Sequence, residues 1–416
     1  MGRCIGERFS RTHNFSVKIA GGMKRLVIVL LLLAVACGNS PSQSKKSPSA
    51  KSPTPSAAAI PFPSPTPGGP TPPSPMAVAC SSQIPAGHQL ALVKISGVSG
   101  IVVRDVTDIQ HPVTRCVISG GTYLRFINSS RISYIVTSSG DLGASGALYL
   151  VDLNTSTTSL VRAWSSGGYA SWVYAWSPDG QKLSYLSSDS SGVRWHVLSA
   201  AGDKTLASLG TVPGRGVNLD NDDAMVGFSA DGQYVAVEET FTAQKDATTG
   251  TPPIQIVHVS DAKPIYQRSD GTMAVWGATG ARLYFRTTAG VQVWDPTGKV
   301  QAVSAGTLWI RPWPSADGSH IAFATLDAQG NHKVGIIDTN GGPVAQASTE
   351  PRANPGFLAP TLVWYAGEVL CTSTTPCGLG GPALTGKTYI YDLAGVESGS
   401  IDTAFYDSWP HLAGQS

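Results

Sequence analysis

The sequence is poor in charge, with Asp, Glu, Lys and Arg making up only 13% of its 416 residues, against a usual share of about 25%. Residues 1–36 carry a net charge of +5 and residues 37–76 one of +3, so the total of +2 leaves −6 for residues 77–416. Nucleic-acid binding depends on clustered Lys and Arg that neutralise phosphates. Residues 77–416 have no such cluster, and we expect no nucleic-acid partner.

Catalytic motifs are also missing from the sequence. It contains no Gly-x-Ser-x-Gly elbow, no His-Glu-x-x-His and no phosphate-binding glycine loop. The histidines that follow the N-terminal leader occur singly rather than in the closely spaced pairs of metal sites. We therefore predict a protein that is not an enzyme, with no catalytic residue, no metal centre and no cofactor.

The N-terminus has the features of an export signal. Lys24 and Arg25 precede an apolar run at residues 26–36, which is too short to span a bilayer. Residues 1–36 are thus predicted to be a signal peptide. Because Met23 directly precedes Lys24, translation that begins at Met23 is an alternative, and residues 1–22 would then not be part of the protein. The residues before Cys37 are similar to the bacterial lipobox, in which the cysteine is diacylated. We predict lipidation of Cys37; an ordinary signal peptide with a chance cysteine is the alternative.

Residues 37–76 are rich in Pro, Ser and Thr and contain almost nothing to bury. Such a composition cannot form a core and favours extended polyproline-type chain. We predict a disordered, lipid-anchored tether that leads to a folded domain at residues 77–416.

A repeated phrase dominates the domain. It reads Trp-Ser-Pro-Asp-Gly from Trp176, Phe-Ser-Ala-Asp-Gly from Phe228 and Trp-Pro-Ser-Ala-Asp-Gly from Trp313, and a short apolar strand follows each copy. Looser copies begin at Phe126, Trp276 and Trp364. The aromatic residue that begins each copy is expected on the inner strand of its blade. A period of about 40–50 residues built from short strands is typical of a β-propeller. The repeated Asp-Gly pairs predict tight turns rather than catalytic carboxylates.

The order of the strands predicts how the propeller closes. Third-strand ends recur seven times, the domain begins with second, third and fourth strands at about 89–118, and it ends with an inner strand near Trp409. We predict an all-β fold, a single propeller of seven four-stranded blades, closed by the C-terminal strand joining the N-terminal strands. Closure removes exposed sheet edges. Six blades with frayed ends is the alternative.

The repeats at residues 174–186, 226–237 and 311–324 resemble the PD40, or WD40-like, repeats of the TolB family of bacterial periplasmic propellers. Similar repeats form the propeller half of dipeptidyl-peptidase-type enzymes. TolB also has a small α/β domain before its propeller, and residues 37–89 could not fold into one. The resemblance therefore implies the fold, and a role in the Tol system is not carried over.

Four cysteines remain in the domain once Cys4 and Cys37 are set aside. An even number in an exported domain predicts disulfides. Cys371 and Cys377 enclose a short loop that a bridge would close, and Cys80 then pairs with Cys116 by elimination. The Cys80–Cys116 bridge would fix the entry segment, the chain around Cys80 that leads into the domain, to the outer strand of the closing blade.

Two long insertions suggest where a ligand binds. Residues 240–253 and 372–387 are expected to join the second and third strands of their blades, on the same face as the connections between blades. Rigid scaffolds commonly carry function on such loops, so we predict a binding face there. Tolerated surface insertions are the alternative.

Charged residues are expected at the same face. Asp220, Asp222 and Asp223 lie in a connection between blades, where carboxylates could hold Ca²⁺; a solvated turn is the alternative, because the full calcium-loop pattern is missing. Arg311 and Asp407 precede inner-strand aromatic residues and are expected at the mouth of the central channel.

These observations predict an exported, monomeric lipoprotein on the outer surface of a bacterial membrane, attached through its N-terminal lipid only. Its propeller is expected to bind an envelope protein or a glycan without catalysis. The alternative is a propeller enzyme of the lactonase, glycosidase or cofactor-dependent dehydrogenase type, acting at the channel mouth.

Overall fold

A computed structural model describes residues 70–405, apart from residues 82, 86, 96, 140–143, 166–172, 190–191, 211–223, 240–253, 373, 375–381 and 402–403. The chain divides into two compact units, Met1–Ala57 and Ala58–Ser416, and all described residues belong to the second. Within them, no helix has the length and apolar character needed to cross a membrane. The predicted signal peptide and Cys37 lie outside the described residues.

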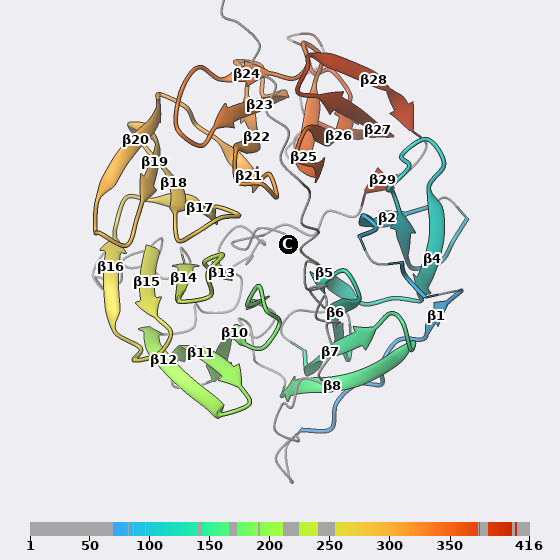
Figure 1. Cartoon of the computed structure of the whole chain (residues 1–416), viewed down its shortest axis with the longest axis vertical. Helices are drawn as coiled ribbons and strands as arrows, with labels where there is room; N and C mark the ends of the chain where they lie inside the picture. The colour runs from blue at the N-terminus through green and yellow to red at the C-terminus, as the bar shows by residue number, and fades with distance from the viewer. Residues whose placement is uncertain are drawn as a thin grey trace, which may run out of the picture. The chain divides into compact units, whose positions relative to one another are not determined.

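The described residues form seven antiparallel sheets arranged as blades around a central axis (Figure 1). The first three complete blades along the chain consist of the following strands. Blade 1 contains β5 (Thr122–Asn128), β6 (Arg131–Thr137), β7 (Gly146–Asp152) and β8 (Thr157–Trp164); blade 2 contains β9 (Tyr174–Trp176), β10 (Leu183–Asp189), β11 (Gly192–Ser199) and β12 (Gly202–Gly210); blade 3 contains β13 (Ala224–Phe228), β14 (Tyr234–Glu239), β15 (Ile254–His258) and β16 (Pro264–Arg268).

The next three blades have the same order of strands. Blade 4 contains β17 (Thr272–Trp276), β18 (Leu283–Thr287), β19 (Gly290–Trp294) and β20 (Val300–Ala305); blade 5 contains β21 (Ile310–Pro314), β22 (His320–Leu326), β23 (His332–Asp338) and β24 (Ala345–Gln346); blade 6 contains β25 (Arg352–Ala359), β26 (Leu362–Glu368), β27 (Leu384–Asp392) and β28 (Val396–Ile401). In each of these blades the first strand is the inner one.

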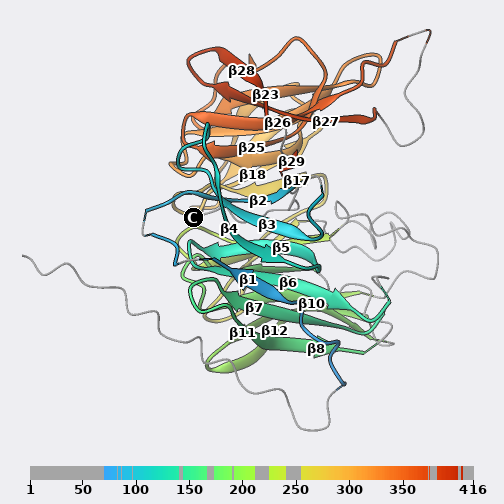
Figure 2. The same ribbon diagram turned by 90° about the vertical axis from the view of Figure 1, so that its right-hand side faces the viewer.

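The seventh sheet, the closure blade, joins the two ends of the domain. Its strand order is β1 (Val78–Cys80), β4 (Val113–Ile118), β3 (Ile101–Asp105), β2 (Leu90–Lys94) and β29 (Ala404–Phe405). The C-terminal β29 lies beside β2, as Figures 1 and 2 show. The seven-bladed propeller and its closure by a C-terminal strand are thus confirmed, while Trp409 lies outside the described residues.

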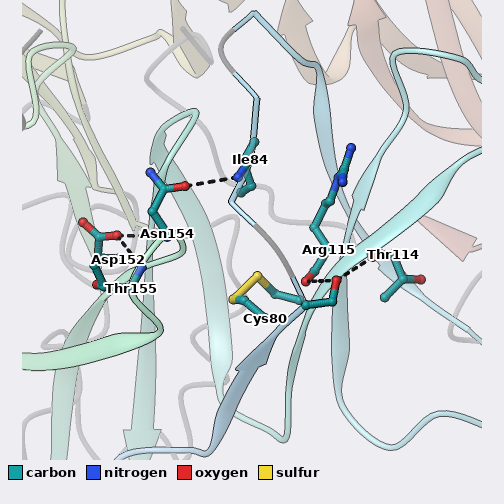
Figure 3. The surroundings of a disulfide bond; sticks show 9 residues. Cys80, Ile84, Thr114, Arg115, Asp152, Asn154 and Thr155 are labelled. Atoms are coloured by element: carbon teal, nitrogen blue, oxygen red, sulfur yellow. Dashed lines mark hydrogen bonds between the residues drawn. A yellow bond between two sulfur atoms is a disulfide. The ribbon is translucent and has the colours of Figure 1, made fainter.

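The closure blade has five strands where four were expected, because β1 adds to its outer edge. β1 pairs with β4 in antiparallel register, which places Cys80 opposite Cys116. These two cysteines form a disulfide across a Cα–Cα distance of 4.0 Å, surrounded by the contacts in Figure 3. Beyond it, the Ser81 amide donates to the Arg115 carbonyl at 2.8 Å. Covalent and hydrogen bonds therefore fix the entry segment to the outer strand.

The bridge predicted between Cys371 and Cys377 is described only in part. Cys371 takes part in a disulfide, and Cys377, its expected partner, lies outside the described residues. The entry segment also begins earlier than the sequence suggested, since the Tyr149 hydroxyl donates to the Pro73 carbonyl and the Met76 amide donates to the Tyr134 hydroxyl at 3.0 Å. Contacts with the propeller therefore extend into the segment predicted to be tether.

The repeated phrase forms the turn that joins the first and second strands. The Ser177 hydroxyl donates to the Asp179 carboxylate at 2.5 Å, and the Gly180 amide closes the turn on the Ser177 carbonyl at 2.8 Å. Gly180 has a φ of 66°, in the left-handed region that glycine adopts without strain. Asp231 and Asp317 occupy the same place in their turns. The turn role of these three aspartates is confirmed.

Inner-strand aromatic residues join neighbouring blades. The indole Nε1 of Trp176 donates to the Ser133 hydroxyl of blade 1, and that of Trp276 donates to the Gly227 carbonyl of blade 3, both at 2.8 Å. The expectation for Trp364 was wrong, because it lies on the second strand β26. The inner aromatic of blade 6 is Phe357, which precedes a short turn without the Asp-Gly pair.

Candidate functional site

The propeller has two faces that could carry a functional site, one at each end of its inner strands. Each inner strand begins at the face that carries the connections between blades and the loops between second and third strands; we call this the loop face. It ends at the face that carries the turns between first and second strands, which we call the turn face. Residues 240–253 follow β14 and precede β15, as expected for the loop face. The second insertion begins and ends earlier than expected, because β26 ends at Glu368 and β27 begins at Leu384.

Of the residues predicted for the binding face, only Arg311 is described. Asp220, Asp222, Asp223 and Asp407 lie outside the described residues. Arg311 is the second residue of the inner strand β21, and its Nη1 donates to the Asn354 Oδ1 of the neighbouring inner strand β25 at 2.8 Å. This contact links blades 5 and 6 at the loop-face end of their inner strands.

Arg311 also belongs to a group of bulges that the sequence analysis missed. Tyr123, Met273, Arg311 and Asn354 have positive φ values of 53°, 53°, 49° and 51°. Each lies near the start of an inner strand, where the pairing with the second strand shifts register. A left-handed conformation costs a non-glycine residue about 1–2 kcal/mol. Retained strain of this kind clusters at functional sites, and bulges redirect side chains.

A buried carboxylate holds one of these bulges in place. Glu238, on the second strand of blade 3, is only 1% exposed. Its two carboxylate oxygens accept hydrogen bonds from the Met273 and Ala274 amides, each at 2.7 Å. Charge-assisted hydrogen bonds are about twice as strong as neutral ones. The bulge of β17 is therefore fixed by the preceding blade. The one sequence signal was an acidic residue at the end of an apolar strand.

The turn face contains a cavity of about 380 Å³ next to the closure blade. It lies where the inner strands of blades 1, 5 and 6 end, and the beginning of β2 forms the remaining wall. Trp313 and Trp364 line it as an edge-to-face pair with ring centroids 6.2 Å apart. Its lining residues are Gly87, His88, Gln89, Leu90, Ala91, Leu92, Phe126, Asn128, Ser129, Trp313, Pro314, Ala316, Phe357, Leu358, Ala359, Pro360 and Trp364.

His88 is the ionisable side chain of this cavity wall. Its Nδ1 lies 2.5 Å from the Asp105 carboxylate, which also accepts hydrogen bonds from Arg115 Nη2 at 2.6 Å and from the Thr107 hydroxyl at 2.7 Å. Burial alone would raise the pKa of Asp105, but these hydrogen bonds outweigh it and hold that pKa well below its usual range. In the tautomer of His88 that donates from Nδ1 to Asp105, Nε2 is a hydrogen-bond acceptor.

The His88–Asp105 pair was not predicted, because the two residues are separated along the chain and the fold brings them together. A carboxylate that orients an imidazole is the arrangement of a general base in hydrolases. The same pair could instead hold the imidazole in place so that its second ring nitrogen accepts a hydrogen bond from a bound ligand. Among the described residues, no group of three or more His, Cys, Asp or Glu could hold a metal ion. The candidate calcium ligands Asp220, Asp222 and Asp223 lie outside the described residues.

No family model and no curated protein matches the sequence. Similar solved structures include TolB from Acinetobacter baumannii (19% identity over 75% of this chain and 80% of that one, TM-score 0.41). They also include the β-propeller domain of the Trilobed protease from Pyrococcus furiosus (12% identity, 77% and 97%, TM-score 0.47). A putative 6-phosphogluconolactonase from Bacteroides uniformis is similar too (13% identity, 77% and 98%, TM-score 0.48). Solved structures similar to this chain thus include TolB and other propellers, and the likeness is one of fold alone.

Proposed function

We propose that this chain is an exported lipoprotein, anchored to the outer surface of a bacterial membrane through Cys37, whose propeller binds an envelope protein or a glycan. Export is supported by the disulfide between Cys80 and Cys116 and by the oxidised state of Cys371, because disulfides persist in oxidising compartments. The apolar leader before Cys37 supports the same destination.

The observation that carries the binding role is the set of four left-handed bulges at the start of inner strands. Their strain is retained at equivalent positions of four blades, two of which are linked by the Arg311–Asn354 hydrogen bond. The Arg311 guanidinium is a fixed cationic donor suited to carboxylates and other acidic or hydroxyl-rich groups. Rigid scaffolds commonly carry binding residues at such a loop-bearing face, which supports a recognition role for this ring.

A capture experiment tests this role. The mature protein, its Arg311→Ala variant and its Lys299→Ala variant are cross-linked to envelope extract, and binding of each captured component is then measured with purified material. Lys299 is the matched control, since it is an exposed cation in the turn between β19 and β20, on the turn face. We expect Arg311→Ala to weaken binding at least tenfold, about 1.4 kcal/mol, and Lys299→Ala to leave it unchanged. Equal binding by all three proteins would remove Arg311 and the loop face from the proposal.

The His88–Asp105 pair favours a second candidate function, a hydrolase of the lactonase or glycosidase type at the turn face. The test is turnover of chromogenic esters, lactones and glycosides by the full chain and by His88→Gln. Activity that falls at least 100-fold in His88→Gln would favour the enzyme. Equal background rates for the two proteins would count against it.

A further inference from the structure

Three side chains on one face of blade 2 have the chemistry of a nucleophile, a base and a carboxylate. Ser187 lies on β10, His196 on β11 and Asp203 on β12, three strands that pair in this order (Figure 1). In the register of the sheet, His196 is opposite both Tyr185 and Thr205. Because side chains alternate between the two faces of a sheet, Ser187 shares the face of Tyr185, and Asp203 shares that of Thr205. The fold thus gathers three residues that no short motif joins.

The distances between these side chains follow the same order. His196 Nε2 lies 2.9 Å from the Ser187 hydroxyl oxygen, and His196 Nδ1 lies 3.4 Å from Asp203 Oδ1. In the tautomer that carries its proton on Nδ1, Nε2 accepts a hydrogen bond from the Ser187 hydroxyl. The imidazole then joins the serine to the carboxylate, as in a Ser-His-Asp triad, which is recognised by its geometry and not by position in the sequence.

Asp203 is held in its ionised form. Burial alone would raise its pKa, but hydrogen bonds from His196 and Tyr185 outweigh burial and lower that pKa. The Tyr185 hydroxyl donates to Asp203 Oδ2 at 2.6 Å, and burial raises the pKa of Tyr185, so the phenol remains a donor. A negative charge at this place stabilises the imidazolium that forms when a histidine takes up the proton of a serine.

The orientation of the imidazole is fixed by stacking. The rings of Tyr185 and His196 are almost parallel, with centroids 4.8 Å apart and an interplanar angle of 5°. The Arg162 guanidinium of blade 1 lies over the Tyr185 ring, 3.8 Å from its centroid, and its Nη1 donates to the Leu186 carbonyl at 3.4 Å. Contacts from two blades therefore hold the base in place before a substrate arrives, which is the condition for efficient catalysis by fixed groups.

The exposure of the three side chains limits the size of a substrate. Ser187 is half-buried, and the side chain of His196 is only 12% exposed. A small acyl group fits this access better than a polymer does. Arg194 is directly opposite Ser187 in the ladder, and a guanidinium beside a serine can stabilise the negative charge that develops on an attacked carbonyl oxygen.

We propose that Ser187 is a nucleophile for small acyl esters, with His196 as its general base and Asp203 as the positioning residue. The Ser187 oxygen bonds to the acyl carbon while its proton passes to His196 Nε2. The ester C–O bond then breaks, and the alcohol leaves with that proton. Attack of water on the acyl-serine, by the same proton route, releases the carboxylic acid and restores the serine. This activity is separate from the binding role of the loop face and from the cavity on the turn face.

Covalent labelling tests the nucleophile. The full chain is incubated with a fluorophosphonate probe and, separately, with p-nitrophenyl acetate, and the modified peptide is located by mass spectrometry. We expect an adduct on Ser187 and release of nitrophenol, both lost in Ser187→Ala. His196→Gln should slow labelling at least 100-fold. Ser208→Ala is the matched control and should label at the original rate, because Ser208 is an exposed serine of β12 in the same blade.

Asp203 is tested by replacement and rescue. Asp203→Asn should slow labelling at least tenfold and Asp203→Glu should restore part of the rate, whereas loss of a purely structural contact would lower Tm and leave the labelling rate of the folded protein unchanged. The location of the adduct on the original protein decides the question even where a variant does not fold. Absence of an adduct on Ser187, or equal rates in His196→Gln, would overturn the proposal. Turnover that persists in Ser187→Ala and is lost in His88→Gln would also overturn it and assign the reaction to the turn face.

Discussion

Backbone strain at a single turn residue can be relieved by a substitution that leaves the packing of the core unchanged. Ser156 has a φ of 55° in the turn between β7 and β8. Glycine adopts this conformation freely, so we expect Ser156→Gly to raise the free energy of unfolding by about 0.5–1 kcal/mol. Ser159→Gly is the control, because glycine inside the strand β8 should lower it by a similar amount. Urea unfolding measures both, and a loss of stability in Ser156→Gly would contradict the assignment of strain.

Asp105 should make stability depend on pH. Its hydrogen bonds from Arg115, His88 and Thr107 outweigh the effect of burial and depress its pKa in the folded protein. Folding therefore favours the ionised form, and the resulting stability is present above the unfolded pKa of about 3.9 and is lost as pH falls below it. We expect Asp105→Asn to lower the free energy of unfolding at pH 7 by about 2–3 kcal/mol.

The decisive measurement for Asp105 is the pH profile. Urea unfolding of the variant should lose less stability between pH 5 and pH 3 than unfolding of the original protein does. Parallel profiles would show that the carboxylate does not carry this pH dependence.

At the scale of elements, β1 depends on its disulfide. The strand has three residues and pairs only with β4, and the bridge closes a sequence separation of 36. Replacing Cys80 and Cys116 together by Ala should lower the free energy of unfolding by about 2–4 kcal/mol. Amide exchange should then rise in residues 77–81 before it rises elsewhere, and the same pattern should follow reduction by a thiol. Exchange unchanged in β1 would mean that hydrogen bonds alone hold the strand.

Elements that carry their own turn signal could be predicted from the sequence. Trp176, Phe228 and Trp313 precede Asp-Gly turns whose geometry is local, so their inner strands were correctly identified. Blade 6 lacks that turn, and Trp364, an aromatic residue on the second strand, was mistaken for the inner one. The bulges could not be predicted, because contacts from other blades fix them. Glu238, for example, holds Met273 from a neighbouring sheet.

At the scale of the whole molecule, the closure of the ring could be predicted from the order of the strands. The domain begins with a second strand and ends with an inner strand, and these complete one blade only if the two ends of the domain meet. The fifth strand of the closure blade was missed, since three residues are too few to show a periodic pattern. The turn-face cavity and the His88–Asp105 pair were missed for a different reason. Both arise where segments distant in sequence meet, and no spacing along the chain encodes them.

The described surface predicts a monomer. Its large exposed apolar side chains are spread over several blades, with one small group around Val369, Leu370 and Leu384. Interfaces between subunits usually need a contiguous apolar patch. We expect light scattering to give the mass of one chain at micromolar concentration. A concentration-dependent dimer would direct attention to the group around Val369.

The bridge at the edge of the closure blade also determines how the domain would respond to tension. A pull on the chain before Val78 enters β1 and passes through the Cys80–Cys116 bond into β4. Residues 81–115, which contain β2 and β3, lie inside the loop that this bond closes. They are bypassed by the force, and so is the pairing of β2 with β29 that completes the ring. A force applied to the chain before β1 would therefore load β4 without pulling β2 away from β29.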